Sequence, residues 1–237
     1  MSDTLARSNT LLEGRPPLAI LRWAVEHFSP RLTLATAFNP EDNVLLDTIA
    51  RHQLPIDVFT IDTGLLFDET RELWRTLEAR YGLQIRAVEP AQSVAAQAGE
   101  SGDRLWAYAP DQCCALRKVA PLRRGLADFD AWISGIRREQ SPTRADARVV
   151  GFDLFTGLVK LNPLAAWTPA DVAAYVSERA VPVNPLHARG YPSVGCAPCT
   201  APALVGADSR SGRWAGQAKT ECGLHWVDPI RTSELTV

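Results

Sequence analysis

Short stretches with the alternating pattern of a strand are followed by longer stretches with the spacing of a helix along most of this chain. A strand pattern at residues 31–38, for example, precedes a helical pattern at 41–53 and a second strand pattern at 56–61. Strands that are joined through helices run parallel, because the crossover helix returns the chain to the same edge of the sheet. The alternation therefore predicts an α/β fold, with a mainly parallel sheet flanked by helices.

The same periodicity places the other expected elements. Strands are predicted at 84–88, 130–134 and 158–161, and helices at 17–29, 67–81, 114–124 and 169–178. Ligands of parallel sheets bind beyond the carboxyl ends of the strands. Those ends place three segments on one rim, namely Phe38–Asp42, Asp62–Phe67 and Gly135–Gln140.

The periodic pattern stops near residue 190, and Gly, Pro, Ala and Ser dominate residues 190–217. We therefore expect an α/β domain over residues 1–190 and an irregular C-terminal arm over residues 191–237. A compact domain seldom keeps so long an irregular segment without a functional reason. Three of the five cysteines lie in this arm.

Composition excludes several classes of protein. Hydrophobic residues make up 46% of the 237 residues and charged residues 22%, which excludes global disorder. The net charge of −2 argues against a broad nucleic-acid-binding surface but not against a small anion site. No apolar run reaches the roughly 18–20 residues that span a bilayer. No secretory signal is visible either, so the expected location is the cytoplasm.

Four of the five cysteines form two close pairs, Cys113-Cys114 and Cys196-x-x-Cys199. Two such pairs supply four sulfur ligands for a metal site. Adjacent cysteines rarely chelate one tetrahedral zinc ion because successive side chains diverge, whereas the irons of a cubane cluster are spread apart. The spacing thus favours an iron–sulfur cluster over zinc. The alternative is that Cys113 and Cys114 are buried small hydrophobic residues.

The fifth cysteine, Cys222, stands between Lys219 and His225. A nucleophilic thiol needs thiolate character, which cationic neighbours favour, and it must be accessible. Lys219 and His225 supply a cationic field, whereas Glu221 opposes it. Cys222 is therefore a candidate nucleophile, and an inert cysteine is the competing interpretation.

Six motifs together resemble the assimilatory sulfonucleotide reductases, and specifically the adenylyl-sulfate (APS) reductase branch of that family. Each motif is weak or moderate alone, but six in the family's order, spanning most of residues 31–225, are highly specific. They are Asp62-Thr-Gly-x-Leu-Phe-x-Glu-Thr70, Cys113-Cys-Ala-Leu-Arg-Lys118 with Pro121-Leu122, Gly135-Ile-Arg-Arg-Glu-Gln-Ser141, Gly195-Cys-Ala-Pro-Cys199, Arg210-x-x-Arg213-Trp214 and Lys219-Thr-Glu-Cys-Gly-Leu-His225.

The resemblance implies an adenine nucleotide α-hydrolase-like core, related to the ATP pyrophosphatases, and a 4Fe-4S cluster on the two cysteine pairs. It also implies that Cys222 attacks the sulfur of adenylyl sulfate, releases AMP and becomes S-sulfocysteine, from which thioredoxin or a similar dithiol releases sulfite. This reaction belongs to sulfate assimilation. The expected partners are therefore adenylyl sulfate and thioredoxin, with a homo-oligomer left open and neither nucleic acid nor membrane expected.

Cations are expected around the substrate, because a thiolate and a phosphosulfate repel each other. Lys118, about one helical turn after Cys114, is the expected catalytic cation, and His225 completes the catalytic set with Cys222. The expected substrate-binding residues are Thr36, Asp62, Gly64, Arg137, Arg138, Gln140, Arg210 and Arg213, with Arg144 ranked lower. An ion pair with Glu139 or Asp146 is the alternative for Arg138.

The segment 36–42 departs from the family pattern. It occupies the place of a phosphate-binding loop after the first strand, but Ala37 stands where a serine is common and the loop has no glycine. Phosphate binding through Thr36 or through backbone N–H groups therefore competes with a plain strand-to-helix turn.

Three other functions compete with an APS reductase. The first is a reductase of the 3′-phosphorylated substrate (PAPS) or of both nucleotides, although the PAPS branch generally lacks the two cysteine pairs. The second is a pyrophosphatase-type enzyme that inserts sulfur into tRNA, which the missing glycine-serine loop and the near-neutral charge oppose. The third is a zinc-binding module in which Cys222 is incidental.

Overall fold

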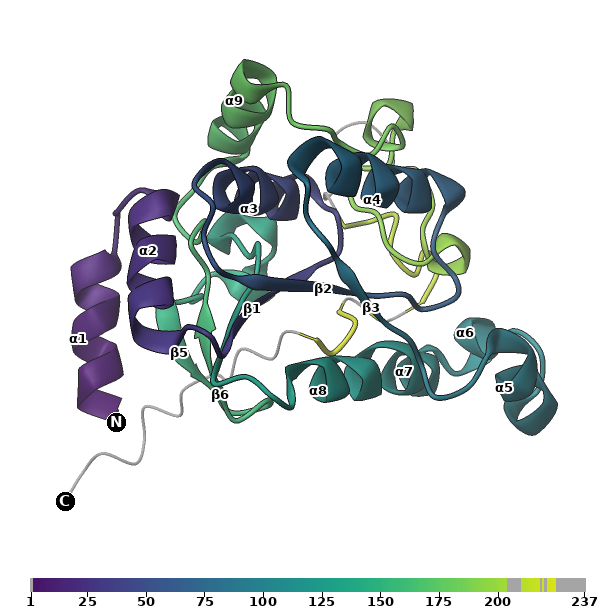
Figure 1. Cartoon of the computed structure of the whole chain (residues 1–237). Helices are drawn as coiled ribbons and strands as arrows, with labels where there is room; N and C mark the ends of the chain where they lie inside the picture. The colour runs from purple at the N-terminus through teal and green to yellow at the C-terminus, as the bar shows by residue number, and fades with distance from the viewer. Residues whose placement is uncertain (1, 204–209, 218, 220, 225–237) are drawn as a thin grey trace.

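A six-stranded sheet with the order β3-β2-β1-β4-β6-β5 forms the centre of the computed structural model, which describes residues 2–203, 210–217, 219 and 221–224 (Figure 1). All neighbouring strands are parallel except β5 and β6. The predicted α/β fold with a mainly parallel sheet is therefore confirmed. The strands are β1 (Leu32–Thr36), β2 (Asp57–Ile61), β3 (Arg86–Val88), β4 (Ala131–Ile133), β5 (Val150–Asp153) and β6 (Leu158–Leu161).

Strand β1 is the central strand of the sheet. It pairs in parallel with β2 on one side and with β4 on the other, so that Leu34 lies opposite both Val58 and Ile133. Leu32 and Leu34 are fully buried, as expected for a strand covered on both faces. This alignment brings the carboxyl ends of β1, β2 and β4 to the same edge, which is where the three predicted rim segments begin.

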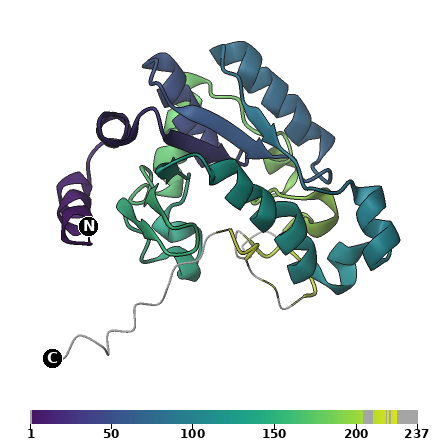
Figure 2. The same cartoon turned by 60° about the horizontal axis from the view of Figure 1, so that its bottom comes forward.

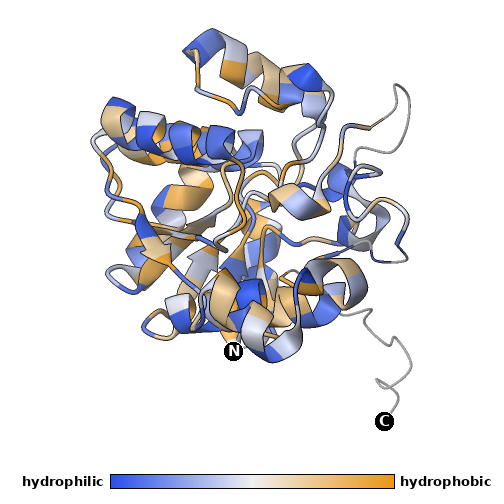
Figure 3. Cartoon of the chain, turned by 90° about the vertical axis from the view of Figure 1, so that its right-hand side faces the viewer, coloured by the Kyte–Doolittle hydropathy of each residue, from blue (hydrophilic) through white to orange (hydrophobic). Residues whose placement is uncertain are grey.

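Helices cover both faces of the sheet (Figures 1 and 2). Helices α3 and α4 lie on one face, and the run from α5 to α8 lies on the other. In Figure 3 the helices carry hydrophilic residues on part of their circumference and hydrophobic residues on the rest, as expected for elements with one face on the sheet. The helices are α1 (Ser2–Leu12), α2 (Pro17–Phe28), α3 (Pro40–Arg51), α4 (Asp68–Tyr81), α5 (Val94–Ser101), α6 (Leu105–Tyr108), α7 (Pro110–Cys114), α8 (Ala120–Leu126) and α9 (Pro169–Arg179).

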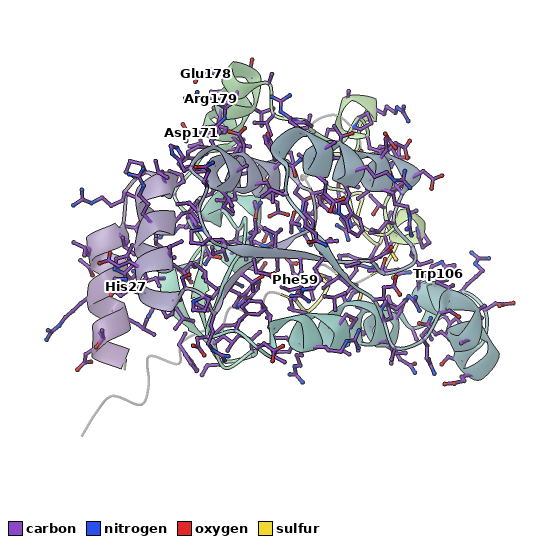
Figure 4. The ribbon with its side chains drawn as sticks, viewed as in Figure 1. His27, Phe59, Trp106, Asp171, Glu178 and Arg179 are labelled. Carbon is purple, nitrogen blue, oxygen red and sulfur yellow. The ribbon has the colours of Figure 1, made fainter. Side chains whose placement is uncertain are left out.

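The core has one cluster on each side of the sheet. Alternation along β2 directs Val58 into the larger cluster, with Leu34 and Leu45, and directs Phe59 into the smaller one. Phe59 lies in the middle of the molecule (Figure 4) and packs with Val88, Leu122, Leu126 and Trp132. Leu224 of the C-terminal arm packs against this smaller cluster. The arm is thus anchored where α8 meets the sheet.

The helix predicted at 114–124 differs from the observed one. The structure has α7, then a π-helix at Ala115–Val119, and then α8. A π-helix adds a residue to the turn and changes which side chains face inward, and such turns are frequent at functional sites. Here it buries both Arg117 and Lys118, which regular helical spacing does not predict.

Two elements at the β5 edge were not predicted from the sequence. Helix α1 packs against β5, and only three of its eleven residues are large and apolar. Three apolar residues are too few to show the spacing of a helix, so the sequence alone does not distinguish this segment from an irregular polar one. Strand β5 is short and pairs through Gly151 with β6 in the antiparallel direction, and its glycine weakens the strand pattern.

The described part of the arm contacts the sheet domain closely. Cys196 forms an isolated bridge with Leu66, and Thr200 forms one with Arg213. The described part of the arm also contains a 3-10 turn at Ala197–Cys199. The boundary proposed near residue 190 stays a prediction. In the described residues, no helix combines the length and the apolar character that crossing a membrane requires.

Adjacent leucines in α1 provide a test of the fold. Leu12 is 4% exposed and belongs to the core, whereas Leu11 is 60% exposed. We expect Leu12→Ala to lower the free energy of unfolding by about 2–4 kcal/mol, because it leaves a cavity. Leu11→Ala should change it by less than about 0.5 kcal/mol. Urea unfolding measures both values, and equal effects would show that α1 does not pack as described.

Candidate active site

A cavity of about 240 Å³ opens at the carboxyl ends of β1, β2 and β4. Its walls come from the loop after β1, from Thr63 and Leu66 after β2, and from the loop after β4. Cys222 and Leu224 of the arm complete the lining. The cavity lies where ligands bind in parallel sheets, and it brings the arm and the predicted rim together.

The loop after β1 uses its backbone donors internally. The Phe38 N–H donates to Thr36 Oγ1 at 3.1 Å, and the Ala37 N–H donates to Asp42 Oδ2 at 2.8 Å. Thr36 lines the cavity, as predicted. Because two N–H groups of the loop are already bonded, the geometry favours a strand-to-helix turn over a cradle of free amides.

Asp42 joins the loop after β1 to the loop after β4. Its carboxylate is buried and accepts hydrogen bonds from the backbone of Ala37, Asn39 and Gly135. A Cβ on Gly135 would come within 2.3 Å of Asp42 Oδ1, so only glycine allows this approach. Burial, reinforced by the charge of Glu41, raises the pKa of Asp42 to about 7 although the three N–H donors oppose the rise.

The loop after β4 directs Arg137 and Gln140 into the cavity lining. Arg137 Nε donates to Glu41 Oε1 at 2.8 Å, and both side chains of this pair are nearly buried. Gln140 Oε1 accepts from the Arg137 N–H at 3.1 Å and from Arg144 Nη1 at 2.7 Å. The Gln140 side chain therefore links the backbone of Arg137 to the side chain of Arg144.

Three of the predicted substrate-binding residues are not among the residues that line the cavity. Arg138 forms two hydrogen bonds with Glu13, at 2.7 and 2.9 Å, rather than with Glu139 or Asp146. Asp62 forms an ion pair with Arg71 at 2.9 Å and accepts from the Gly64 N–H. Gly64 has a φ of +71°, so it shapes the turn after β2. Thr63, which stands between Asp62 and Gly64 in the sequence, lines the cavity instead.

Arg144, Arg210 and Arg213 gather at the arm side of the cavity. Arg144 and Arg210 both form ion pairs with Glu221, at 3.1 and 2.9 Å. Arg213 stacks on the Trp214 ring at 4.7 Å and donates to the Val194 carbonyl at 3.3 Å. Guanidinium groups favour oxyanions such as phosphate and sulfate, so three of them on one side make the cavity suited to an anion.

Gly195 explains part of the Gly-Cys-x-x-Cys motif. A Cβ at this position would lie 2.2 Å from Arg213 Nη2, so the guanidinium passes directly over the glycine backbone. The residue next to Cys196 must therefore be small for Arg213 to reach the cavity.

The two cysteine pairs lie on neighbouring elements. Cys113 and Cys114 end α7, whereas Cys196 directly precedes the 3-10 turn of the arm and Cys199 ends it. Cys196 Sγ lies 3.3 Å from Thr63 Oγ1, so this pair sits beside the rim of the sheet. Cys196 is near enough to Cys113, Cys114 and Cys199 for its charge to act on the pKa of each.

Burial raises the pKa of three of these thiols, Cys113, Cys114 and Cys199, and that of Cys114 reaches about 11. All five cysteines have free thiols. In the part of the chain that the structure describes, no group of three or more His, Cys, Asp or Glu side chains is arranged to hold a single metal ion.

Lys118 lies between the cysteines and the cavity. The π-helix buries its side chain, and the ammonium faces the Trp214 ring at 5.8 Å. Burial lowers the pKa of Lys118, but the nearby charges of Cys196, Cys222 and Cys114 outweigh burial, and its pKa is raised. The structure thus places this cation where the sequence predicts it, beside both the cysteine pairs and the cavity.

Cys222 lines the cavity. In Figure 1 the yellow part of the arm that lies just above α8 is the end of its described residues. Gly223, next to Cys222, has a φ of +79° and turns the chain toward Leu224. Lys219 forms an ion pair with Asp111 and faces Trp214 at 5.3 Å. The third predicted catalytic residue, His225, lies outside the described residues.

Sequence reasoning missed or underrated several residues of this site. Arg144 was ranked low because a single arginine carries little signal, yet it is 7% exposed and lines the cavity. Asp42 and the Arg137–Glu41 pair were not predicted, because only the fold brings their loops together. Lys160 on β6 was not predicted either, although it is near enough to Cys222 and Glu221 to feel their charges. Burial lowers the pKa of Lys160 to about 8, and the charges of Asp153, Cys222 and Glu221 oppose this effect.

Asp42 provides a pH test of this geometry. Its ordinary pKa is 3.8, so between that value and about 7 the folded protein keeps a proton that the unfolded chain has released. Stability from this group is therefore present at low pH and is lost as the pH rises toward 7. Between pH 5 and 8, wild type should lose about 2–3 kcal/mol relative to Asp42→Asn.

Thermal unfolding of both proteins across this pH range measures the difference. Glu72→Gln is the matched control, because Glu72 is an exposed carboxylate in an ion pair with Arg75, and its pH profile should follow that of wild type. Parallel profiles for wild type and Asp42→Asn would show that Asp42 is not a buried carboxylate of raised pKa.

Known proteins share both this sequence and this fold. The family model "Phosphoadenosine phosphosulfate reductase domain" matches residues 31–202. The chain is 52% identical, over 90% of each chain, to "Phosphoadenosine 5'-phosphosulfate reductase" from Gloeobacter violaceus. It is 45% identical to "Adenosine 5'-phosphosulfate reductase" from Rhodococcus opacus, over 95% of this chain and 94% of that one.

A solved structure agrees with these relatives. Phosphoadenylyl-sulfate (PAPS) reductase from Candida auris, as its phosphate complex, superposes with a TM-score of 0.77 and 33% identity, covering 85% of this chain and 98% of that chain. The adenine nucleotide α-hydrolase-like core and the family resemblance inferred from the six motifs are thereby confirmed. This chain, whose cavity is lined by these arginines and by Cys222, therefore belongs to the phosphoadenosine phosphosulfate reductase family.

Proposed function

We propose that this protein reduces adenylyl sulfate to sulfite and AMP, with Cys222 as the nucleophile. One observation carries the proposal: the Cys222 thiol lines the same cavity as Lys118 and the arginines of the arm. A thiol alone has no preference for an anhydride of phosphate and sulfate, but a thiol among converging cations is suited to attack on one. The names of the relatives point to the same reaction class.

In the proposed reaction a dithiol supplies the two electrons that reduce adenylyl sulfate. The Cys222 thiolate attacks the sulfur of the substrate, an S–S bond forms, and the S–O bond breaks with its electron pair going to the AMP oxygen. A thiolate of thioredoxin, or of a similar dithiol, then attacks Cys222 Sγ and displaces sulfite. Its second thiol resolves the mixed disulfide. The dithiol is oxidised by two electrons, and Cys222 returns to its starting state.

The pocket cations stabilise charge where it develops. Arg213 is held over Gly195 and against Trp214, so it need not reorganise when the substrate's charge shifts toward the phosphate. Lys118 is buried, and a buried cation acts through a lower effective dielectric than an exposed one. Both groups are therefore placed to favour departure of AMP.

We further propose that Cys113, Cys114, Cys196 and Cys199 hold a 4Fe-4S cluster. The support is the donor set: four thiols from two segments, near enough for their charges to interact, with buried Lys118 beside them. When bound, the cluster would supply structural order and a fixed charge at the edge of the cavity. Lys118 would offset the negative charge of the thiolate ligands.

The relatives leave one choice of substrate open within the proposal. The Gloeobacter protein is named for the 3′-phosphorylated nucleotide and the Rhodococcus protein for adenylyl sulfate. The two cysteine pairs favour adenylyl sulfate, so a reductase of PAPS or of both nucleotides is the second candidate. Free thiols throughout the chain suit the cytoplasm, which is the location we propose, and a homo-oligomer stays a prediction.

Turnover with the two nucleotides tests the substrate and the nucleophile. With thioredoxin as reductant, we expect sulfite from adenylyl sulfate at a kcat/KM at least about tenfold above that for PAPS. Cys222→Ser should lower kcat by at least about a thousandfold while AMP binding is retained, because the serine lacks the nucleophilic thiolate. A serine variant with substantial activity would exclude Cys222 as the nucleophile.

The cluster proposal has a spectroscopic test. Anaerobically purified protein should be brown and contain about four irons and four sulfides per chain. Cys196→Ser should lose most of the iron and the visible absorbance, because it removes one ligand. Cys222→Ser, the matched control, should keep both. Colourless protein that contains zinc and no iron would overturn the proposal.

A further inference from the structure

The residue before the proposed nucleophile has an unusually large set of partners. Glu221 Oε2 accepts from Arg144 Nη2 at 3.1 Å and from Arg210 Nη2 at 2.9 Å. Its Oε1 is within 3.3 Å of Thr143 Oγ1 and 3.5 Å of Ser141 Oγ. Donors from two separate segments thus converge on one carboxylate.

This cluster is largely withdrawn from water. The side chains of Arg144, Arg210 and Glu221 are 9%, 16% and 18% exposed. Ion pairs that are shielded in this way are screened less by salt than surface pairs are. Arg144 also donates to Gln140 Oε1 at 2.7 Å, so the cluster connects the arm to the loop after β4.

Cys222 lies in the sequence between two residues that are fixed by contacts with the sheet domain, Glu221 and Leu224. Glu221 precedes it directly, so their Cα atoms are only about 3.8 Å apart. Leu224, two residues after it, packs against the cluster around Phe59 and Leu122. Gly223 turns the chain between Cys222 and Leu224 with its φ of +79°. Fixing both neighbours leaves the Cys222 thiol little freedom except to face the cavity.

The two arginines bound to Glu221 are also lining residues of the cavity. Without a nucleotide, this carboxylate from the chain itself offsets part of their positive charge. An entering anion and Glu221 therefore draw on the same two guanidinium groups, so the carboxylate opposes the binding of the anion.

We propose that Glu221 is a positioning residue: its bridge to Arg144 and Arg210 holds Cys222 over the cavity and offsets part of the charge of these arginines before substrate enters. The proposal rests on the function proposed above and deepens it. Two effects follow from removing the carboxylate. The Cys222 thiol becomes more accessible, and the cavity binds anions more tightly. A residue that merely stabilised the fold would weaken anion binding instead.

The test compares wild type with Glu221→Gln, which keeps the shape of the side chain and removes its charge. The first measurement is the rate of Cys222 alkylation by iodoacetamide across a pH series, with peptide mass mapping on the anaerobic, nucleotide-free protein. The plateau at high pH reports access to the thiol, and the midpoint reports its charge environment. The second measurement is AMP affinity by calorimetry. Glu13→Gln is the matched control, because Glu13 forms the corresponding pair with Arg138 away from the cavity.

We expect Glu221→Gln to raise the alkylation plateau by about threefold or more and to lower the Kd for AMP by a similar factor, because it removes both ion pairs of Glu221. Glu13→Gln should match wild type in both measurements. An unchanged plateau, or weaker AMP binding in Glu221→Gln, would overturn the proposal.

Circular dichroism verifies that Glu221→Gln folds. If it does not, Thr143→Val removes one donor to Glu221 and should raise the plateau in the same direction by a smaller factor, and no change would overturn the proposal. Sulfonate transfer enters neither measurement. A wild type that fails to bind AMP would contradict the proposed function, whereas the alkylation plateau would still decide the role of Glu221.

Discussion

The parallel pairing of β1 with β2 and β4 is the constraint on which the rest of the structure depends. It brings three loops from distant parts of the sequence to one edge of the sheet. Asp42 then joins two of them by accepting from the backbone of Ala37 and Gly135, and Thr63 after β2 contacts Cys196 of the arm. The cavity exists because these contacts hold loops and arm at fixed separations.

The arginines that line the cavity have partners within the protein, either a carboxylate or an aromatic ring. Arg137 is paired with Glu41, and Arg144 with Glu221, while Arg213 rests on Trp214. Burying an unpaired charge costs several kcal/mol, so these partners allow the cations to be withdrawn from water without a substrate. The net charge of −2 therefore coexists with a cavity lined by several arginines, as the proposed function requires.

The sequence predicted the sheet because its information is local: apolar alternation over a few residues defines β1, β2 and β4, and their spacing defines the crossovers. It also predicted that Cys222, Lys118 and Arg213 share a site, although that came from motif order and not from periodicity. Pairings between distant residues were not predictable. Asp42 with Gly135, and Arg138 with Glu13, depend on how two loops meet after folding. The π-helix that buries Lys118 also breaks the regular helical spacing.

The most direct test of the central claim is the covalent state of Cys222 after one turnover. Anaerobic protein is mixed with equimolar adenylyl sulfate and no dithiol, and is then analysed by intact mass, peptide mapping and quantification of AMP. The account predicts one sulfonate per chain on the Cys222 peptide, one equivalent of AMP, and release of sulfite when thioredoxin is added. Release of AMP with Cys222 unmodified, or a sulfonate on another cysteine, would contradict it.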